Sequence, residues 1–391
     1  EVLFLRPKSE NGSMETEKYM EKITGKYAQA EIFADDAEDY AKAQIEMICN
    51  NEVSDGCIVR IMPDVHPGQA GPIGLTMTVG RRIIPQLLGI DIGCGIVCIQ
   101  LREKRMELQK LDKVIRERIP SGFKIRQKSH HRAEAFELQE LRCFKHVSRE
   151  KAVLSLGTLG SGNHFIEVDR DEEGNLYVVI HSGSRHLGKE VTDYYVKAGA
   201  ALLKERGTET PYPLTWLEGE LMEDYLHDLL TVQRYAQLNR EIMAEEIMKG
   251  MKLKAQEARS SVHNYFDASE GMRILRKGAI SARRGEQIVI PVNMRDGIIL
   301  GTGKGNPEWN FSAPHGSGRK IQRDEVKERY TVAAFRKEMK GIYSSCIAAD
   351  TLDEAPFAYR SIEDIREKIR DTAEIEKILK PVYNFKAGDK R

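Results

Sequence analysis

The sequence predicts an α+β fold, in one large domain with a β-rich core and surrounding helices. Three observations lead to this prediction. Helix-like and strand-like segments follow one another in mixed order, glycine-rich loops separate many of them, and neither a repeat nor a linker divides the 391 residues. The domain is expected to cover residues 21–391. Residues 1–20 are expected to be an N-terminal segment, whose first four residues, Glu1 to Phe4, are either an expression remnant or a trimmed native end.

Six segments are expected to be helices, the first amphipathic and the second highly charged: residues 37–50, 104–118, 189–205, 219–251, 324–340 and 361–379. The fourth is unusually long, and its apolar residues recur at helical spacing, so we interpret it as a packed core helix. Residues 126–149 carry three histidines and many charges, and are expected to form a surface excursion.

Strand-like runs occupy residues 57–62 and the glycine-rich stretch 274–318, and residues 83–97 are apolar and interrupted by glycines. Residues 164–169 and 176–180 are expected to form a hairpin around a polar turn. If its loop is the four residues 171–174, His164 lies directly opposite His181, with Cβ atoms about 5 Å apart. Two imidazoles at that distance can hold one metal ion. The alternative is a stacked surface pair, and a shift of one residue in the register would separate the two rings.

Composition and charge limit the class of protein. Hydrophobic residues make up 41% and charged residues 31%, as in ordinary globular proteins. Sixty basic residues balance sixty acidic ones, so a phosphate-binding surface must be local. No apolar run approaches the roughly 18 residues of a membrane span, and no signal peptide is visible. The six cysteines show no paired spacing. We therefore expect a cytoplasmic protein with reduced thiols and no membrane partner.

The first candidate metal ligands are Asp91 and Cys94, in a loop with glycine at positions 89, 93 and 95. Glycines let the backbone turn so that both side chains can converge, and a thiolate with a carboxylate suits a borderline divalent ion. The alternative is a tight turn with a small buried cysteine. His263 lies in the segment Ser261–Phe266, but a lone histidine in such a context is usually structural and would not be singled out by itself.

The segment 313–319 places His315 before Gly316, Ser317 and Gly318. The backbone N–H groups of such residues can bind phosphate oxygens, and Arg319 can add a bidentate contact. A neutral imidazole is also a competent nucleophile. The alternative is a glycine-rich turn with an exposed histidine. No Lys-x-Asp-Gly motif for nucleotidyl transfer is present, and residues 301–306 lack the spacing of a P-loop.

Together these segments resemble the RtcB family of RNA ligases over nearly the whole chain. The motifs that carry the resemblance are residues 25–27, 62–66, 89–95, 156–165, 181–185, 262–265, 303–307, the loop around His315, and Lys386. The resemblance implies an enzyme that uses GTP and two Mn²⁺ ions. Such an enzyme joins RNA ends bearing a 3′-phosphate or 2′,3′-cyclic phosphate to 5′-hydroxyl ends.

The resemblance also implies roles for individual residues. The metal ligands would be Asp91, Cys94, His164, His181 and His263, with the Cys94 thiolate bridging both ions, and His315 would be the residue that takes GMP. Arg185 and Arg319 would contact RNA phosphates. The guanine-nucleotide contacts would be Asn163, His164, Glu167, His263, Asn264, Pro291, Val292, Asn293, Met294, His315, Gly316, Ser317, Gly318 and Lys386.

One segment departs from the family. Many members carry Pro-Gly-Ser-Met-Gly before the nucleophile loop, whereas residues 291–297 read Pro-Val-Asn-Met-Arg-Asp-Gly here. Pro291 and Met294 are kept, but a family serine position falls at Ile298, and Gln69 stands where a lysine is often found. Phosphate and base contacts from residues 291–298, and with them the nucleotide preference, are therefore where this chain is expected to differ.

Two other functions are consistent with the same residues. One is a two-metal phosphodiesterase that opens 2′,3′-cyclic phosphates without ligation, for which His315 is not needed. The other is a non-catalytic nucleotide- or RNA-binding protein, which would have no use for a full ligand set. For the ligase, the expected partners are RNA ends from tRNA halves or damaged RNA, GTP, and an activating protein.

Overall fold

The structure is a computed structural model that describes residues 21–388, so the segment 1–20 lies outside it. A twelve-stranded sheet forms its centre, and among its neighbouring strands only β2 and β3 run parallel. In spatial order its strands are β1 (Glu21–Thr24), β2 (Gln29–Ile32), β3 (Val59–His66), β4 (Ile73–Thr78), β11 (Ile274–Lys277), β10 (Ala255–Asp267), β6 (Cys94–Leu101), β8 (Leu176–Ser182), β7 (Phe165–Arg170), β16 (Ala373–Lys386), β14 (Gly297–Gly303) and β13 (Gln287–Asn293). Two small ladders add β12 (Ala279–Ser281) with β15 (Ser312–Pro314), and β5 (Arg82–Ile83) with β9 (Leu217–Glu218).

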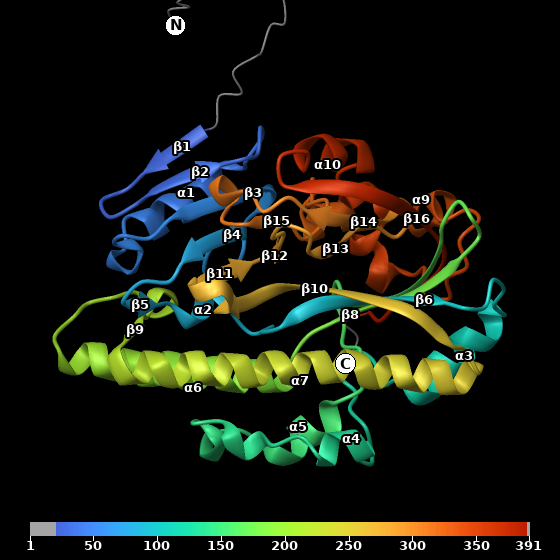
Figure 1. Cartoon of the computed structure of the whole chain (residues 1–391), viewed down its shortest axis with the longest axis horizontal. Helices are drawn as coiled ribbons and strands as arrows, with labels where there is room; N and C mark the ends of the chain where they lie inside the picture. The colour runs from blue at the N-terminus through green and yellow to red at the C-terminus, as the bar shows by residue number, and fades with distance from the viewer. Residues whose placement is uncertain (1–20, 389–391) are drawn as a thin grey trace, which may run out of the picture.

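Helices cover the sheet, which confirms the α+β prediction. Helices α6 (Arg185–Glu205) and α7 (Gly219–Met251) lie side by side along one face of the sheet, with α4 (His131–Glu134) and α5 (Arg149–Ser155) beyond them (Figure 1). The remaining α-helices are α1 (Asp39–Cys49), α2 (Pro85–Leu88), α3 (Leu108–Arg118), α8 (Arg323–Arg329), α9 (Val332–Glu338) and α10 (Ile362–Lys368). Between residues 21 and 388, no helix has the length and apolar character needed to cross a membrane.

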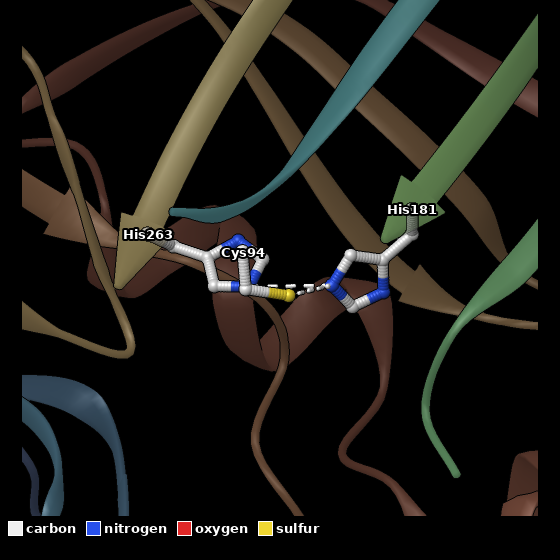
Figure 2. A group of neighbouring side chains, drawn as sticks. All are labelled: Cys94, His181 and His263. Atoms are coloured by element: carbon white, nitrogen blue, oxygen red, sulfur yellow. Dashed lines mark hydrogen bonds between the residues drawn. The ribbon is translucent and has the colours of Figure 1, made fainter. Parts of the chain in front are cut away.

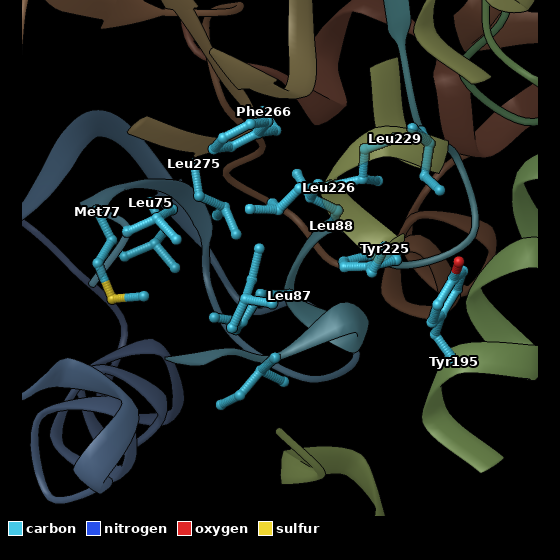
Figure 3. Packing of buried hydrophobic residues seen from close by; sticks show 14 of the residues in the cluster. Leu75, Met77, Leu87, Leu88, Tyr195, Tyr225, Leu226, Leu229, Phe266 and Leu275 are labelled. Carbon is cyan, nitrogen blue, oxygen red and sulfur yellow. The ribbon is translucent and has the colours of Figure 1, made fainter. Parts of the chain in front are cut away.

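Helix α7 has the bounds that its apolar spacing predicts. Tyr225 and Leu226 pack against Leu88 of α2, while Phe266 and Leu275 of the sheet lie just beyond (Figure 3). This apolar layer fixes the helix against the strands β6, β8 and β10. The central part of α7 therefore lies directly behind the ends of these three strands.

Two helix predictions need correction. The segment 324–340 forms two helices, because Tyr330 leaves the helical path and the Thr331 side chain caps the N–H of Ala334. The segment 361–379 is helical only as far as Lys368, and from Ala373 it belongs to β16. Pairing of β16 with β14 on one side and β7 on the other outweighs the local helical preference.

The stretch 126–149 is not merely a surface excursion. Leu138, Leu141 and Cys143 are buried in the main apolar core. The N–H groups of Arg142 and Cys143 donate to the buried carboxylate of Asp228 on α7. The many charged residues of this stretch made its buried apolar residues, which pack on the side of helix α7, hard to recognise from the sequence.

Candidate metal centre and nucleotide pocket

Five potential metal ligands converge at the ends of neighbouring strands. The Cys94 Sγ lies 3.5 Å from His164 Nε2 and 3.2 Å from His181 Nε2. The Nε2 atoms of His181 and His263 are 3.2 Å apart, and His164 Nε2 is 3.0 Å from a carboxylate oxygen of Asp91. Figure 2 shows Cys94, His181 and His263 pointing toward one another from three strands. All five residues that the resemblance implies as ligands are thus brought together.

Glycines make this convergence possible. Gly93 has a positive φ of 73°, and a Cβ there would lie 2.8 Å from the Cβ of Ala236 on α7. A Cβ on Gly183 would lie 1.9 Å from the Asp91 carboxylate. These two positions let the Asp91–Cys94 loop turn tightly between α7 and the end of β8.

The predicted register of the β7–β8 hairpin is wrong by one residue. Phe165, not His164, pairs with His181, and Arg170 pairs with Leu176. The Asp171 carboxylate accepts the N–H groups of Glu173 and Asn175, which makes a loop of five residues, 171–175. His164 nevertheless reaches His181, because it precedes the strand in a glycine-rich turn, and their ring centroids are 5.2 Å apart.

His263 lies at a β-bulge. Val262 pairs with Gly95, Asn264 pairs with Cys94, and His263 is the extra residue between them. A bulge redirects a side chain and often lies beside a functional site. Asn264 holds the ligand loop from the same place, since its amide donates to the carbonyls of Leu88 and Asp91. Sequence spacing contains no signal for this bulge.

The donor set fits a divalent cation. His181 donates from Nδ1 to the Asn163 carbonyl at 3.0 Å, which leaves its Nε2 as a lone-pair donor. Burial lowers the pKa of His181 and His263 well below the ordinary value, and neighbouring imidazoles lower it further. Burial and the Asp91 charge raise the pKa of the Cys94 thiol. Neutral imidazoles so close together repel one another unless a proton or a cation lies between them, and a cation also favours the thiolate.

His315 lies beside this centre, with its ring centroid 4.9 Å from that of His263. Its Nδ1 is 2.7 Å from a carboxylate oxygen of Asp64, which is fully buried in β3. A carboxylate at Nδ1 favours the tautomer with hydrogen on Nδ1 and an unprotonated Nε2. Asp64 was not singled out from the sequence, although it lies in the 62–66 motif.

A pocket of about 770 Å³, partly open to solvent, extends from His315. Most of the residues that the resemblance implies as nucleotide contacts line it: Asn163, Glu167, Pro291, Val292, Asn293, Met294, His315, Gly316, Ser317, Gly318 and Lys386. The other three, His164, His263 and Asn264, do not. His263 and Asn264 line a second pocket of about 850 Å³, which meets the first at His66, Asn163 and His315.

A buried carboxylate organises the far end of the first pocket. Glu354 accepts from Lys386 Nζ and from Arg319 Nη2, both at 2.6 Å. Burial alone would raise the pKa of Glu354, but these cations and Arg323 hold it well below the ordinary value. Tyr359, whose hydroxyl donates to Glu354, completes this end. Lys386 and Arg319 were predicted from the sequence. Glu354, Arg323 and Tyr359 were not, because they lie outside the motifs described above.

A second buried acid lies on the pocket wall. Glu167 accepts from Asn384, and burial raises its pKa. Asp169, two residues along the same strand, is fully buried, and burial together with the Glu167 charge raises its pKa strongly. Burial of these two carboxyl groups close to each other thus favours their protonated forms.

The segment that departs from the family forms the turn between β13 and β14. The Asn293 side chain accepts the N–H groups of Arg295 and Asp296, and so stabilises the turn itself. Ile298 is buried and also lines the pocket. Ile298 thus makes this part of the wall of the first pocket more apolar than the family's serine would.

The two arginines expected to contact RNA differ in their surroundings. Arg319 lines the first pocket beside Glu354. Arg185 donates to Thr158 Oγ1 and the Gly122 carbonyl, and thereby joins two loops near His164. Contact of either residue with RNA stays a prediction.

Lys277 is a further residue that sequence reasoning missed. It lines the second pocket with Gln69, Gly89 and Asp91, and burial lowers its pKa to about 8. Within residues 21–388 its ammonium has no hydrogen-bonding or ion-pair partner. A buried, unpaired ammonium beside His315 is suited to bind an anion.

Comparisons with known proteins show the family of the chain. A family model described as tRNA-splicing ligase RtcB matches residues 51–387. The chain is 28% identical over 370 residues to the RNA-splicing ligase RtcB of Escherichia coli K12, covering 84% of this chain and 90% of that protein. It is 28% identical over 400 residues to the tRNA-splicing ligase RtcB of Archaeoglobus fulgidus, with 78% and 82% covered. The chain is also 26% identical over 402 residues to the tRNA-splicing ligase RtcB of Aeropyrum pernix, covering 78% of this chain and 83% of that protein.

Proposed function

Because the chain belongs to the RtcB family of RNA ligases, we propose that it joins RNA 3′-phosphate or 2′,3′-cyclic phosphate ends to 5′-hydroxyl ends, using GTP and two Mn²⁺ ions. The observation that carries this proposal is the position of His315. It lies where the two pockets meet, and Asp64 directs the lone pair of its imidazole to Nε2.

The first pocket would hold the guanine nucleotide. Lys386 and Glu167 would offer polar groups to the base, and the backbone of Gly316–Gly318 can bind phosphate oxygens. Asp91, Cys94, His164, His181 and His263 would hold the ions, which neutralise phosphate charge when bound. A charged Lys277 would add a cation on the side of the second pocket.

A 2′,3′-cyclic phosphate end would first be opened by water to the 3′-phosphate, and the reaction would then proceed in three displacements. His315 Nε2 attacks the α-phosphorus of GTP, so that a P–N bond forms and pyrophosphate leaves. An oxygen of the RNA 3′-phosphate then attacks the same phosphorus, which frees His315 and leaves GMP on the RNA end. Finally the 5′-hydroxyl oxygen attacks the RNA 3′-phosphorus, the new phosphodiester forms, and GMP leaves with its electron pair.

The RNA ends would enter through the second pocket. Arg185, which joins two loops near His164, and Arg319, on the wall of the first pocket, are proposed to contact phosphates. We propose residues 21–391 as the ligase domain, and the cytoplasm as its place of action. The substrates would be tRNA halves or damaged RNA, and an activating protein partner is expected.

The test is a covalent GMP adduct. Protein, Mn²⁺ and GTP labelled at the α-phosphate should give an acid-labile labelled protein. His315→Ala should retain metal and bind GTP but form no adduct, whereas His146→Ala, which changes a histidine stacked on Tyr194, should react normally. The same His315→Ala variant should still seal RNA that already carries a guanylylated 3′-end.

Other results would point elsewhere. An adduct of normal yield in His315→Ala would mean that a different residue is the acceptor. If the unaltered protein formed no adduct with any nucleotide but opened cyclic phosphates, the phosphodiesterase would be the better assignment. A protein with neither activity would be a binding protein.

A further inference from the structure

Helix α7 carries three polar side chains on the face that packs behind the metal centre: Gln233, Asn239 and Arg240. Asn239 is fully buried and Arg240 is 2% exposed. Burying an amide or a guanidinium in a core is costly unless it is hydrogen-bonded. Their partners therefore show what they stabilise.

Arg240 binds the backbone beside two ligands. Its Nη1 donates to the Gly93 carbonyl at 2.8 Å and to the Ser182 carbonyl at 2.7 Å. Gly93 precedes Cys94, and Ser182 follows His181. A single nitrogen thus fixes the spacing between the segments that carry the thiol and one imidazole.

Asn239 binds the neighbouring loops. Its side-chain oxygen accepts the N–H groups of Gly157 and Thr158, at the start of the turn that leads to His164. Its amide donates to the Gly183 carbonyl at 3.1 Å, and Gly183 is the residue against which the Asp91 carboxylate lies. All the hydrogen-bonding capacity of this amide is used on ligand-bearing loops.

Gln233 binds the end of β10, the segment that carries His263. Its amide donates to the Phe266 carbonyl at 3.1 Å, and its side-chain oxygen accepts the Phe266 N–H at 2.8 Å. Phe266 lies three residues beyond the bulge at His263. This pair of hydrogen bonds fixes the end of β10 after the bulge.

We propose that Gln233, Asn239 and Arg240, here called the α7 clamp, are positioning residues that set the geometry of the metal ligands. Four separate segments carry the five ligands, and each is hydrogen-bonded to this one rigid helix. The lone pairs of the ligand atoms repel one another at these short distances when no cation lies between them. The α7 clamp must therefore keep the ligand-bearing segments from moving apart. Outer-shell groups of this kind typically change metal affinity about 10- to 100-fold when they are removed.

The proposal rests on the metal centre of the proposed function. A titration with Co²⁺ as the only added metal tests the α7 clamp and the metal centre together. Titration of the metal-free full chain with Co²⁺ should give a thiolate-to-metal absorption band from Cys94. Arg240→Lys, which keeps the charge but not the planar head group, and Asn239→Ser should weaken Co²⁺ binding at least about tenfold and shift the band. Arg240→Met should have a larger effect if it folds.

Asp228→Asn is the matched control. Asp228 is equally buried on α7, but it binds the N–H groups of Arg142 and Cys143 and the hydroxyl of Tyr195, away from the ligands. It should lower the melting temperature without changing the Co²⁺ band or affinity. If clamp variants bind Co²⁺ as the unaltered chain does, or lose affinity only as far as Asp228→Asn does, the clamp is overturned and the metal centre stands. Absence of Co²⁺ binding by the unaltered chain would overturn both.

Discussion

At the scale of single residues, Asp64 decides which nitrogen of His315 carries the proton. Its carboxylate oxygen lies 2.7 Å from Nδ1 and also accepts the Gly316 N–H at 3.3 Å. An asparagine can rotate its NH₂ toward Nδ1, which would move the ring proton to Nε2 and block the nucleophile. Asp64→Asn should therefore slow formation of the GMP adduct by about 100-fold or more, while GTP still binds.

Single-turnover labelling with α-labelled GTP measures this effect. Asp112→Asn is a suitable control, since Asp112 is also a buried carboxylate but binds Tyr383 and Ser345 far from His315. An unchanged labelling rate in Asp64→Asn would show that the tautomer of His315 is fixed by another group.

Lys277 shows what it costs the fold to bury a lysine at the proposed site with no partner among residues 21–388. Burial lowers its pKa to about 8, below the roughly 10.4 of an unfolded lysine. The folded state then binds fewer protons than the unfolded state between these values, so stability rises with pH there, and the penalty is complete below pH 8. In metal-free protein, Lys277→Met should raise the free energy of unfolding at pH 7 by on the order of 2 kcal/mol.

Urea unfolding at pH 7 and pH 9.5 checks this prediction. The advantage of the methionine variant should shrink at the higher pH, and its ligation activity should be lost. Equal stabilities of the two proteins at pH 7 would mean that the ammonium is better solvated than its burial indicates.

At the scale of elements, the approach of the β8 end to the Asp91 loop depends on Gly183. A Cβ at this position would lie 1.9 Å from the carboxylate, so Gly183→Ala must displace either Asp91 or the strand end. We expect metal affinity to fall at least about tenfold, because Asp91 and His181 lie on the two segments that are forced apart. Gly80→Ala, whose Cβ would meet nothing closer than 3.4 Å, is the control. Metal titration of both variants decides the matter, and normal binding by Gly183→Ala would rule Asp91 out as a necessary ligand.

The elements also show what the sequence can and cannot predict. The bounds of α7 followed from apolar spacing alone, since a long helix repeats its pattern many times. The hairpin register failed by one residue because Asp171 folds back onto Asn175, a local hydrogen bond that strand patterns do not encode. His263 was beyond local reasoning altogether, because its bulge depends on pairing with β6 far away in the chain. Family motifs supplied His263, but they did not include Glu354, and they gave no role to Asp64.

At the scale of the whole molecule, the site is built from segments between residues 64 and 386 that only the complete sheet brings together. Glu354 is a centre of this assembly. It joins Lys386 at the end of β16, Arg319 after the His315 loop, and Arg323 on α8. Three segments that are far apart in the sequence are thus held together at the first pocket by one buried charge.

The negative charge of Glu354 should make the free energy of unfolding depend on pH in the acidic range. The pKa of Glu354 is held below the ordinary 4.5 in the folded state, so its contribution is present above about pH 4.5 and is lost as the pH falls through the lower, folded value. Glu354→Gln leaves buried cations unpaired and should cost about 3–5 kcal/mol at pH 7. The difference from the unaltered protein should narrow steadily below pH 4.5. Urea unfolding between pH 7 and pH 3 measures it, with Glu325→Gln, which breaks an exposed pair with Arg329, as the control. If the difference in the free energy of unfolding between the unaltered protein and Glu354→Gln stayed constant with pH, Glu354 would not be ionised in the folded protein.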